Sequence, residues 1–307
     1  MQWGQIKTLL IISFLVLDIY LFIQFLEKKE ESDIGILEHQ TSTIEEQLAD
    51  DNITYEQLPE EEHEETFISV KQKQFSEEEL IGQNKQIEQD TTIIQKNFIV
   101  SKLDEPIPVS ATISVEQLTN LFNNLVYFSE EYTFWNWNKE ENIIVFFQNK
   151  LDRPVYYNQK GLVLLFLNEE NEIVFYTQTM LGDTESLAEK RKLMRPMEAI
   201  ETLYIANELP QDSHIDNVNI GFYTRVPFET EVQVFAPIWR INVNGERDYF
   251  VNAIEGFIFS TDEEEFLEQA IIDAHEKVRM QHSNNDVLED VYLELEKRVE
   301  DIGPIED

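Results

Sequence analysis

The chain has 307 residues and no cysteine, and it carries 61 acidic against 23 basic residues, a formal net charge of −38. This charge argues against nucleic acid as a partner and against direct docking of the folded part on anionic lipid, because both need a basic surface. Without cysteine there are no disulfides and no thiolate sites. A hydrophobic content of 42%, with 20 Phe, is enough for most of the chain to fold around a core.

Residues 8–26 form the only apolar run of membrane length. The run reads TLLIISFLVLDIYLFIQFL, and at about 1.5 Å per residue it spans roughly 28 Å, close to the hydrocarbon thickness of a bilayer. It is longer than the core of a signal peptide and no small-residue cleavage site follows it. We therefore expect a short tail at 1–7 and an uncleaved transmembrane helix at 8–26. Lysines at both ends leave its orientation open on charge alone.

Asp18 lies near the centre of this run. A carboxylate at that depth costs about 2.5–3.5 kcal/mol on insertion scales, and a helix that serves only as an anchor gains nothing from it. Either the side chain is protonated and tolerated, or a neighbouring helix hydrogen-bonds to its oxygens. The second alternative predicts a partner-contact face at helical spacing around the acid, formed by Ile11, Phe14, Leu15, Asp18, Leu21, Phe22 and Phe25.

The acidic residues are concentrated in two segments. From Glu27 to Glu65 there are fifteen acidic residues against two lysines, and from Asp262 to Asp307 sixteen against four basic ones. The first segment, 27–65, is predicted to be a solvated stalk with one short helix near Thr43–Ala49. The second, 263–307, is predicted to be helical, because Phe266 and the apolar residues after it recur at helical spacing, and docking of its first helix on the domain is favoured.

Between these segments the pattern predicts two related α+β units, at 66–182 and at 183–262. The first has strand signals at 66–70 and 92–100, a capped short helix at Ser76 and a helix from Ser114 to about Leu125. A predicted antiparallel meander follows, with strands at Asn142–Gln148, Val155–Tyr157, Leu162–Leu167 and Ile173–Thr179.

The second predicted unit repeats this order of a helix followed by a meander. Its helix is expected at Met197–Glu208, and Asn244-Gly245 is the strongest hairpin signal in the chain, because both central residues of a type I′ turn need a positive φ. The expected strands are Val218–Arg225, Glu231–Ala236, Ile238–Val243, Tyr249–Ala253 and Phe257–Phe259. The fold class is therefore α+β, with one transmembrane helix ahead of two related helix-plus-meander units.

No pattern in the chain indicates catalysis. The five histidines are not spaced for zinc, no acidic stretch matches a calcium loop, and neither a nucleophile motif nor a Gly-rich phosphate loop is present. We therefore expect no enzyme, no metal and no cofactor. An alternative function is a sensor that binds a wall fragment or a peptide, for which Phe134, Trp135 and Trp137 are candidate contact residues, although such aromatics are more often packed in a core.

The opening reads MQWGQIKTLLIISFLVLDIYLFIQFLEKK, with Trp3, Lys7, Thr8 and a charged exit at Gln24–Lys29. At these positions it resembles the start of the YycI (WalI) family of membrane-anchored regulators. A second stretch, from Pro237 through Trp239 and Gly245 to Gly256, resembles the C-terminal hairpin of YycI and of its partner family YycH. The acidic stalk and the tail beyond about Leu288 are less typical of the family.

The resemblance implies a cytoplasmic N-terminus, an extracytoplasmic domain and no catalytic activity. It also implies a complex with YycH and the sensor histidine kinase WalK (YycG), in which transmembrane helices in the lipid bilayer adjust the output of a kinase that controls cell-wall metabolism. Asp18 and the face around it fit such a contact. The sign of the regulation, the stoichiometry and any extracellular ligand stay open at this point.

Overall fold

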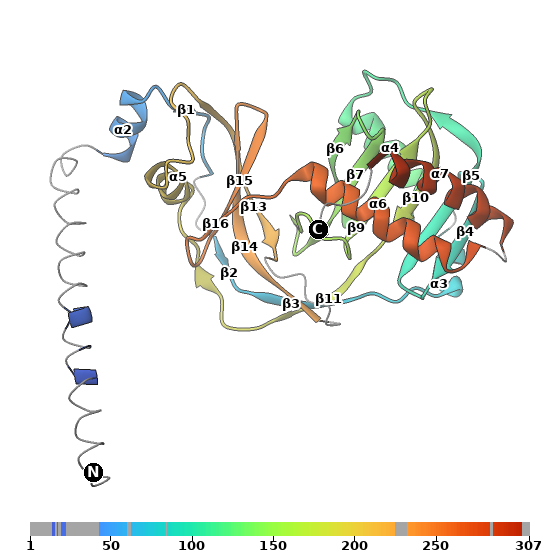
Figure 1. Cartoon of the computed structure of the whole chain (residues 1–307), viewed down its shortest axis with the longest axis horizontal. Coiled ribbons are helices and arrows are strands. Elements are labelled where there is room, and N and C mark those ends of the chain that lie inside the picture. The colour runs from blue at the N-terminus through green and yellow to red at the C-terminus, as the bar shows by residue number, and fades with distance from the viewer. Residues whose placement is uncertain are drawn as a thin grey trace, which may run out of the picture. The chain divides into compact units, whose positions relative to one another are not determined.

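The structure is a computed structural model, and the chain divides into two compact units, Met1–Thr54 and Tyr55–Asp307 (Figure 1). In the first unit the described part of the predicted anchor is helical, and α2 (Ile44–Asp50) follows with a capping box between Thr43 and Glu46. Within the described ranges, no helix is both long and apolar enough to cross a membrane. The structure describes residues 14–15, 17, 20–22, 43–59, 63–83, 85–224, 232–282 and 285–302.

The second unit contains two seven-stranded antiparallel sheets, which give the chain its α+β character. In the first sheet, two strands from the start of the unit lie beside a four-strand meander, and a short strand pairs with β7. Its strands, in spatial order, are β4 (Gln89–Ile94), β5 (Phe98–Pro108), β10 (Glu172–Gln178), β9 (Leu162–Leu167), β7 (Ile143–Lys150) and β6 (Tyr132–Asn138), with β8 (Arg153–Pro154) on β7.

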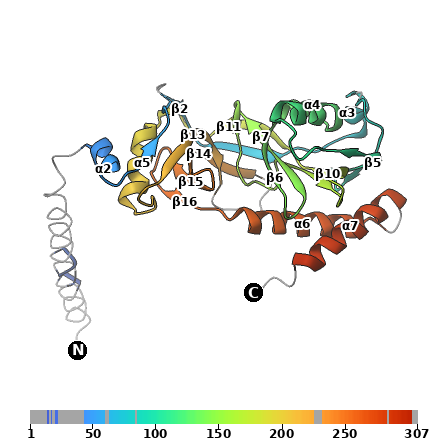
Figure 2. The same cartoon turned by 90° about the horizontal axis from the view of Figure 1, so that it is seen from above.

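Helices cover both faces of the first sheet, as Figure 2 shows from above. On one face α4 (Val115–Leu125), capped by Ser114, packs its Leu118 and Phe122 into a core with the sheet. On the other face α6 (Glu263–Arg279) and α7 (Asp286–Ile302) lie side by side and bury a second core. Because both faces are covered, every residue of β9 is buried.

The second sheet is built around another four-strand meander, which follows α5 (Pro196–Ile205). Its strands are β13 (His214–Tyr223), β14 (Val232–Val243), β15 (Arg247–Asn252) and β16 (Ile258–Phe259), together with β1 (Thr54–Tyr55), β3 (Ile68–Gln72) and β11 (Leu181–Ser186). The remaining elements are α3 (Glu77–Ile81), the 3₁₀ turn η1 (Ser129–Glu131) and the ribbon of β2 (Glu64–Glu65) with β12 (Arg191–Lys192).

The two sheets meet where the chain leaves β8. Val155 forms a parallel bridge to Phe222, and the Tyr156 N–H donates to the Phe222 carbonyl at 2.9 Å. Gly221 makes this approach possible, because a Cβ there would lie 2.8 Å from the Pro154 carbonyl and against the Tyr156 ring. This glycine is therefore required by close backbone approach.

Three strand predictions are wrong. Val155–Tyr157 is not a strand of the first sheet, and β6, which we did not predict, takes the place beside β7. β3 pairs with β14 and β11 of the second sheet and does not join the first α+β unit. Residues 232–236 and 238–243 form one strand, β14, that continues through Pro237, whereas Glu231 lies outside the described residues.

Pro237 is tolerated in β14 because of its position between two partners. On one edge of β14, Val232–Phe235 pair with β3 and Ile238–Val243 pair with β15. The Pro237 carbonyl accepts from Ala253 N–H at 2.9 Å on this edge. The N–H that proline lacks would point to the same edge, where one partner strand ends and the other begins, so the proline costs no ladder hydrogen bond to β13.

The predicted stalk, 27–65, also needs correction at its C-terminal end. Residues from Tyr55 onward belong to the folded second unit. Glu65 is buried and forms ion pairs with Arg153 at 3.2 Å and Lys190 at 3.5 Å. These cations compensate for the burial of its carboxylate, so this part of the acidic segment is structural.

Candidate functional site

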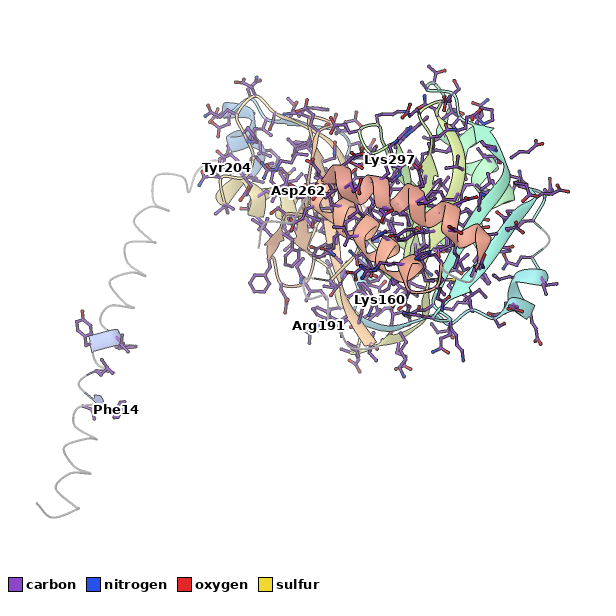
Figure 3. All side chains as sticks on the ribbon, turned by 45° about the vertical axis from the view of Figure 1, so that its right-hand side comes forward. Phe14, Lys160, Arg191, Tyr204, Asp262 and Lys297 are labelled. Atoms are coloured by element: carbon purple, nitrogen blue, oxygen red, sulfur yellow. The ribbon has the colours of Figure 1, made fainter. Side chains whose placement is uncertain are left out.

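The predicted partner-contact face lies only partly within the described residues. Phe14, Leu15, Leu21 and Phe22 are helical, and all four side chains are more than half exposed; Phe14 is labelled in Figure 3. Ile11, Asp18 and Phe25 lie outside the described residues. The assignment of this face to a partner therefore stays a prediction.

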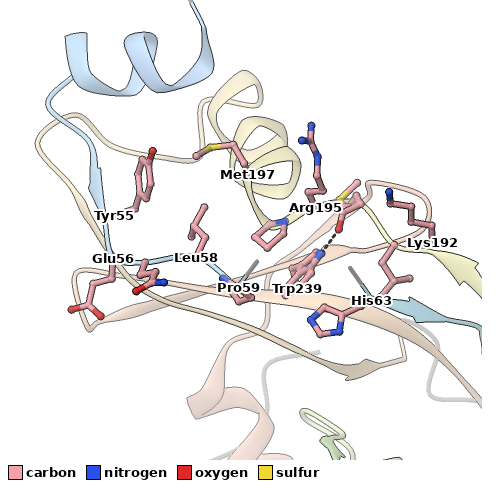
Figure 4. A pocket seen from close by; sticks show the side chains of 13 residues that line it. Tyr55, Glu56, Leu58, Pro59, His63, Lys192, Arg195, Met197 and Trp239 are labelled. Carbon is pink, nitrogen blue, oxygen red and sulfur yellow. Dashed lines mark hydrogen bonds between the residues drawn. The ribbon is translucent and has the colours of Figure 1, made fainter. Parts of the chain in front are cut away.

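The second unit contains a pocket of about 540 Å³ between α5 and the second sheet, shown in Figure 4. Three segments that are far apart in the sequence form it: residues 55–59 with His63, residues 192–197 at the start of α5, and Trp239 on β14. The volume lies in the range of ligand pockets, about 300–1,000 Å³. We refer to it as the α5 pocket.

The floor of the α5 pocket is apolar, and its polar atoms are hydrogen-bonded. Trp239 is 1% exposed and its Nε1–H donates to the Met194 carbonyl at 2.9 Å. The N–H of Met194 donates to Ala253, and that of Leu193 donates to the His63 carbonyl, both at 2.9 Å. The polar groups of the floor are therefore paired within the protein, and the half-buried Met194 and Met197 supply its accessible apolar surface.

The rim of the pocket carries charges of both signs, with Glu56 on the segment 55–59 and two cations at the start of α5. Lys192 and Arg195 line it and are exposed, and they belong to a stretch, 190–195, with four basic and no acidic residues. Arg195 pairs with Glu198, and the Arg195 backbone N–H donates to the same carboxyl, which holds the pKa of Glu198 below its usual range. Since this ion pair is exposed, it contributes little and leaves the guanidinium available to another anion.

A second cluster of charged and aromatic side chains joins the two sheets. Arg240 on β14 donates through Nε and Nη2 to both oxygens of Asp248, at 2.8 and 3.0 Å, and stacks 4.3 Å above the Trp135 ring of β6. The Trp135 Nε1–H and the Asn136 side chain donate to Glu263 at the start of α6, at 3.0 and 2.7 Å. These contacts satisfy one another, so we assign the cluster a structural role.

The aromatic residues proposed for a ligand-binding sensor do not form one cluster. Phe134 and Trp137 pack against the core under α4, where Phe134 contacts Phe146 edge to face with ring centroids 5.6 Å apart. Trp135 packs against the opposite core, under α6. Strict alternation would place Trp135 and Trp137 on the same face of the strand. The register shift between Phe134 and Asn136 changes this alternation, so Trp137 joins Phe134 in one core and Trp135 lies in the other.

The described histidines and carboxylates show no metal centre: within these residues no three of them are close enough to hold an ion. The strongest pKa shifts belong to buried tyrosines. Burial raises the pKa of Tyr156 to about 12 and that of Tyr157 further still, in the joint between the sheets. Such shifts keep the phenols neutral and indicate packing, and the Tyr157 hydroxyl donates to Glu263 at 3.5 Å.

Sequence reasoning missed the α5 pocket. Its lining comes from three segments, residues 55–63, residues 192–197 and Trp239, and no local motif brings them together. One signal was available: the stretch Lys190, Arg191, Lys192 and Arg195 is an exception in a chain of net charge −38. An isolated basic run in an acidic protein marks a local surface of opposite charge.

Comparison with known proteins identifies one family. The model of the YycI family, described as YycI protein, matches residues 31–254. No curated protein sequence matches the chain.

Three solved structures are similar at low identity. An uncharacterized protein from Eubacterium rectale has 10% identity over 69% of this chain and 92% of its own, with a TM-score of 0.40. The C-terminal domain of YpeB from Bacillus megaterium has 11% identity over 64% and 90%, with a TM-score of 0.32. YycH from Bacillus subtilis has 13% identity over 64% and 54%, with a TM-score of 0.35. These values are too low to support an inference about function.

The family match confirms the resemblance noted in the sequence, and it covers the described strands and helices from α2 to β15. It begins at residue 31, so the likeness of the N-terminal segment rests on the residues quoted for it. The chain belongs to the YycI family, because the family model matches most of the 307 residues of the chain.

Proposed function

We propose that the chain is a non-catalytic regulator of the sensor histidine kinase WalK (YycG), which controls cell-wall metabolism, and that it acts together with YycH. The observation that carries this proposal is membership of the YycI family over residues 31–254. The sequence adds that neither a nucleophile motif nor a Gly-rich phosphate loop is present.

The chain is proposed to be a single-pass membrane protein with its N-terminus in the cytoplasm. Residues 8–26 are apolar over a length of roughly 28 Å, which suits a bilayer. The second unit would then lie outside the cell, and the absence of cysteine is compatible with that compartment. In this arrangement the anchor and the folded unit can both contact the kinase and YycH.

Regulation is proposed to act through the anchor, with Asp18 as the central contact. The oxygens of an aspartate in lipid need hydrogen-bond donors, which a Ser, Thr or basic side chain of a neighbouring helix can supply, for roughly 0.6–2 kcal/mol. The apolar residues around Asp18 would pack against the same helix. A contact of this kind fixes the rotation of the anchor against its partner and so can bias the kinase between two states.

The experiment compares variants of the full chain for co-purification with the kinase and YycH from membranes. Asp18→Leu keeps the span apolar and removes the hydrogen-bonding group, so we expect normal membrane insertion and reduced co-purification. The matched control combines Asp18→Val with Val16→Asp. This pair preserves composition but moves the acid by about 160° around the helix, so it should behave like Asp18→Leu.

Wild-type co-purification and wild-type regulon output by both variants would contradict the proposed contact. If the variant with the acid at position 16 co-purifies like wild type, an acid near this depth in the membrane is sufficient, and the helix face on which it lies does not matter. Protease protection on intact cells tests the topology separately.

A further inference from the structure

Two histidines and one tyrosine connect α6 to α7. The ring of His282, just after α6, stacks on the ring of Tyr292 in α7, with centroids 4.2 Å apart and planes at 9°. The ring of His275 in α6 stacks on the same tyrosine at 5.2 Å and 24°. We refer to these three residues as the histidine–tyrosine stack.

This stack lies beside the apolar contact that holds α7 on the first sheet. Leu288, Val291 and Leu295 of α7 are buried in the core that α6 and α7 share with the sheet, and Tyr292 packs against that core. The Tyr292 hydroxyl donates to Glu296, one turn further along α7, at 2.5 Å. The position of the Tyr292 ring therefore depends on the docking of α7.

The His275 ring is placed where only its neutral form fits well. Its Nε2 atom is buried and has no hydrogen-bond partner among the residues that the structure describes. A neutral imidazole has a hydrogen on one ring nitrogen, whereas an imidazolium has one on each. Protonation of His275 would therefore place a charged donor in a buried position without an acceptor. Because Tyr292 stacks on this ring, hydration of the charge requires α7 to move away from α6.

The charges around His275 act in both directions. Burial lowers the pKa of His275 below its usual value of 6.5, Arg279 and His282 lower it too, and Glu296 and Glu276 raise it. The strands under the helices add Lys102, which pairs with Asp290, and the uncharged Thr92 and Gln95. Since the folded state favours the neutral ring, its contribution to stability is present above about pH 6.5 and is lost as the pH falls below that value.

We propose that the histidine–tyrosine stack is a pH-sensitive contact, which holds α7 against α6 and the first sheet at neutral pH and releases it when His275 is protonated. Release would expose the apolar residues of α7 and the sheet face beneath them, and so change the surface that the folded unit offers to a partner. This inference is independent of the proposed transmembrane contact, because its residues all lie in the second unit.

The test measures hydrogen–deuterium exchange of the full chain in neutral detergent by mass spectrometry, at about pH 7.5 and about pH 5.5. Labelling times are scaled for the intrinsic pH dependence of amide exchange. The internal reference is α4, which packs on the opposite face of the first sheet. We expect the protection of α7 relative to α4 to fall at least about threefold at the lower pH, because protonation favours the released helix.

Variants identify the group that titrates. His275→Phe keeps an aromatic ring beside Tyr292 and cannot be protonated, so α7 should be equally protected at both pH values. Arg279→Gln removes a neighbouring cation that opposes protonation of His275, so the loss of protection should be smaller than in wild type. The matched control is His214→Phe on β13, which should respond to pH like wild type.

The outcomes separate the alternatives. The proposal is supported if wild type and His214→Phe lose protection of α7 at the lower pH and His275→Phe does not. It is overturned if wild-type α7 is equally protected at both pH values, or if folded His275→Phe responds like wild type. Loss of the response in His282→Phe and not in His275→Phe would also overturn it. If His275→Phe does not fold, Arg279→Gln decides: a reduced response supports the proposal and an unchanged response overturns it.

Discussion

Removal of Arg240 tests whether the charged cluster between the sheets is structural. The side chains of Arg240 and Asp248 are only 21% and 14% exposed, and two hydrogen bonds at 2.8 and 3.0 Å join them. In Arg240→Ala, Asp248 keeps the hydrogen bond that the Asn242 side chain donates to it at 2.8 Å. Loss of one partner from a buried pair costs about 3–5 kcal/mol.

The partial exposure of Arg240 places the expected cost at the lower end of that range. The lost stacking on Trp135, with the guanidinium carbon 4.3 Å from the ring centroid, adds about 0.5–1 kcal/mol. We therefore expect Arg240→Ala to lower the free energy of unfolding by about 3–4 kcal/mol. Urea unfolding of the full chain in neutral detergent, followed by tryptophan fluorescence at an unchanged m-value, measures this difference.

Two further variants make the test specific. Arg247→Ala removes a neighbouring arginine that also stacks on an aromatic ring, 4.7 Å from the Tyr249 centroid, but is exposed; it should cost less than about 1 kcal/mol. Replacing both Arg240 and Asp248 by Leu leaves no unpaired charge and should cost less than Arg240→Ala alone. Equal effects of Arg240→Ala and Arg247→Ala would refute the reasoning.

Three other predictions concern packing, ionisation and capping. Gly221→Ala places a methyl group against the Tyr156 ring and 2.8 Å from the Pro154 carbonyl, so it should cost about 2–3 kcal/mol in the same unfolding assay. Burial raises the pKa of Tyr156 to about 12, so the folded state favours the neutral phenol. Its contribution to stability is therefore complete below pH 10 and is lost as the pH rises towards 12, and Tyr156→Phe should make the measured loss over this interval less steep. Ser114→Ala removes the acceptor for the Gln117 N–H at the start of α4 and should cost about 1 kcal/mol, measured as a shift of the thermal midpoint.

Local signals predicted those elements whose structure depends on neighbouring residues. Asn244 and Gly245 both have positive φ, 58° and 67°, at the turn between β14 and β15, as the type I′ signal requires. The capping boxes at Ser76 and Ser114 begin α3 and α4. In each case the hydrogen bond or the backbone angle is determined within four residues, so the sequence is sufficient.

Features that depend on distant partners were not predictable in this way. β3 has the same alternation as a strand of the first sheet, and only its pairing with β14 and β11 places it in the second. A proline normally ends a strand. Pro237 is tolerated inside β14 because it lies where the pairing with β3 ends and the pairing with β15 begins. β6 could have been recognised, because its run YTFWNWN is rich in strand-forming aromatic residues.

The candidate site also combines a feature that is visible in the sequence with features that depend on distant partners. The basic stretch at 190–195 is visible in the sequence, but the apolar floor beside it exists only because Trp239 on β14 lies next to the start of α5. Phe134, Trp135 and Trp137 are close in sequence, yet the strand directs them to two different cores. Proximity along the chain indicates a shared site only when side chains share a face.

The central claim is that the anchor recognises a partner inside the membrane. Replacement of residues 8–26 by an unrelated apolar helix of equal length, with the rest of the chain unchanged, tests it most directly. Kinase autophosphorylation is then measured in vesicles containing the kinase and YycH. The account predicts that the replaced anchor inserts normally but no longer changes kinase activity, whereas full regulation by this chimera would contradict it.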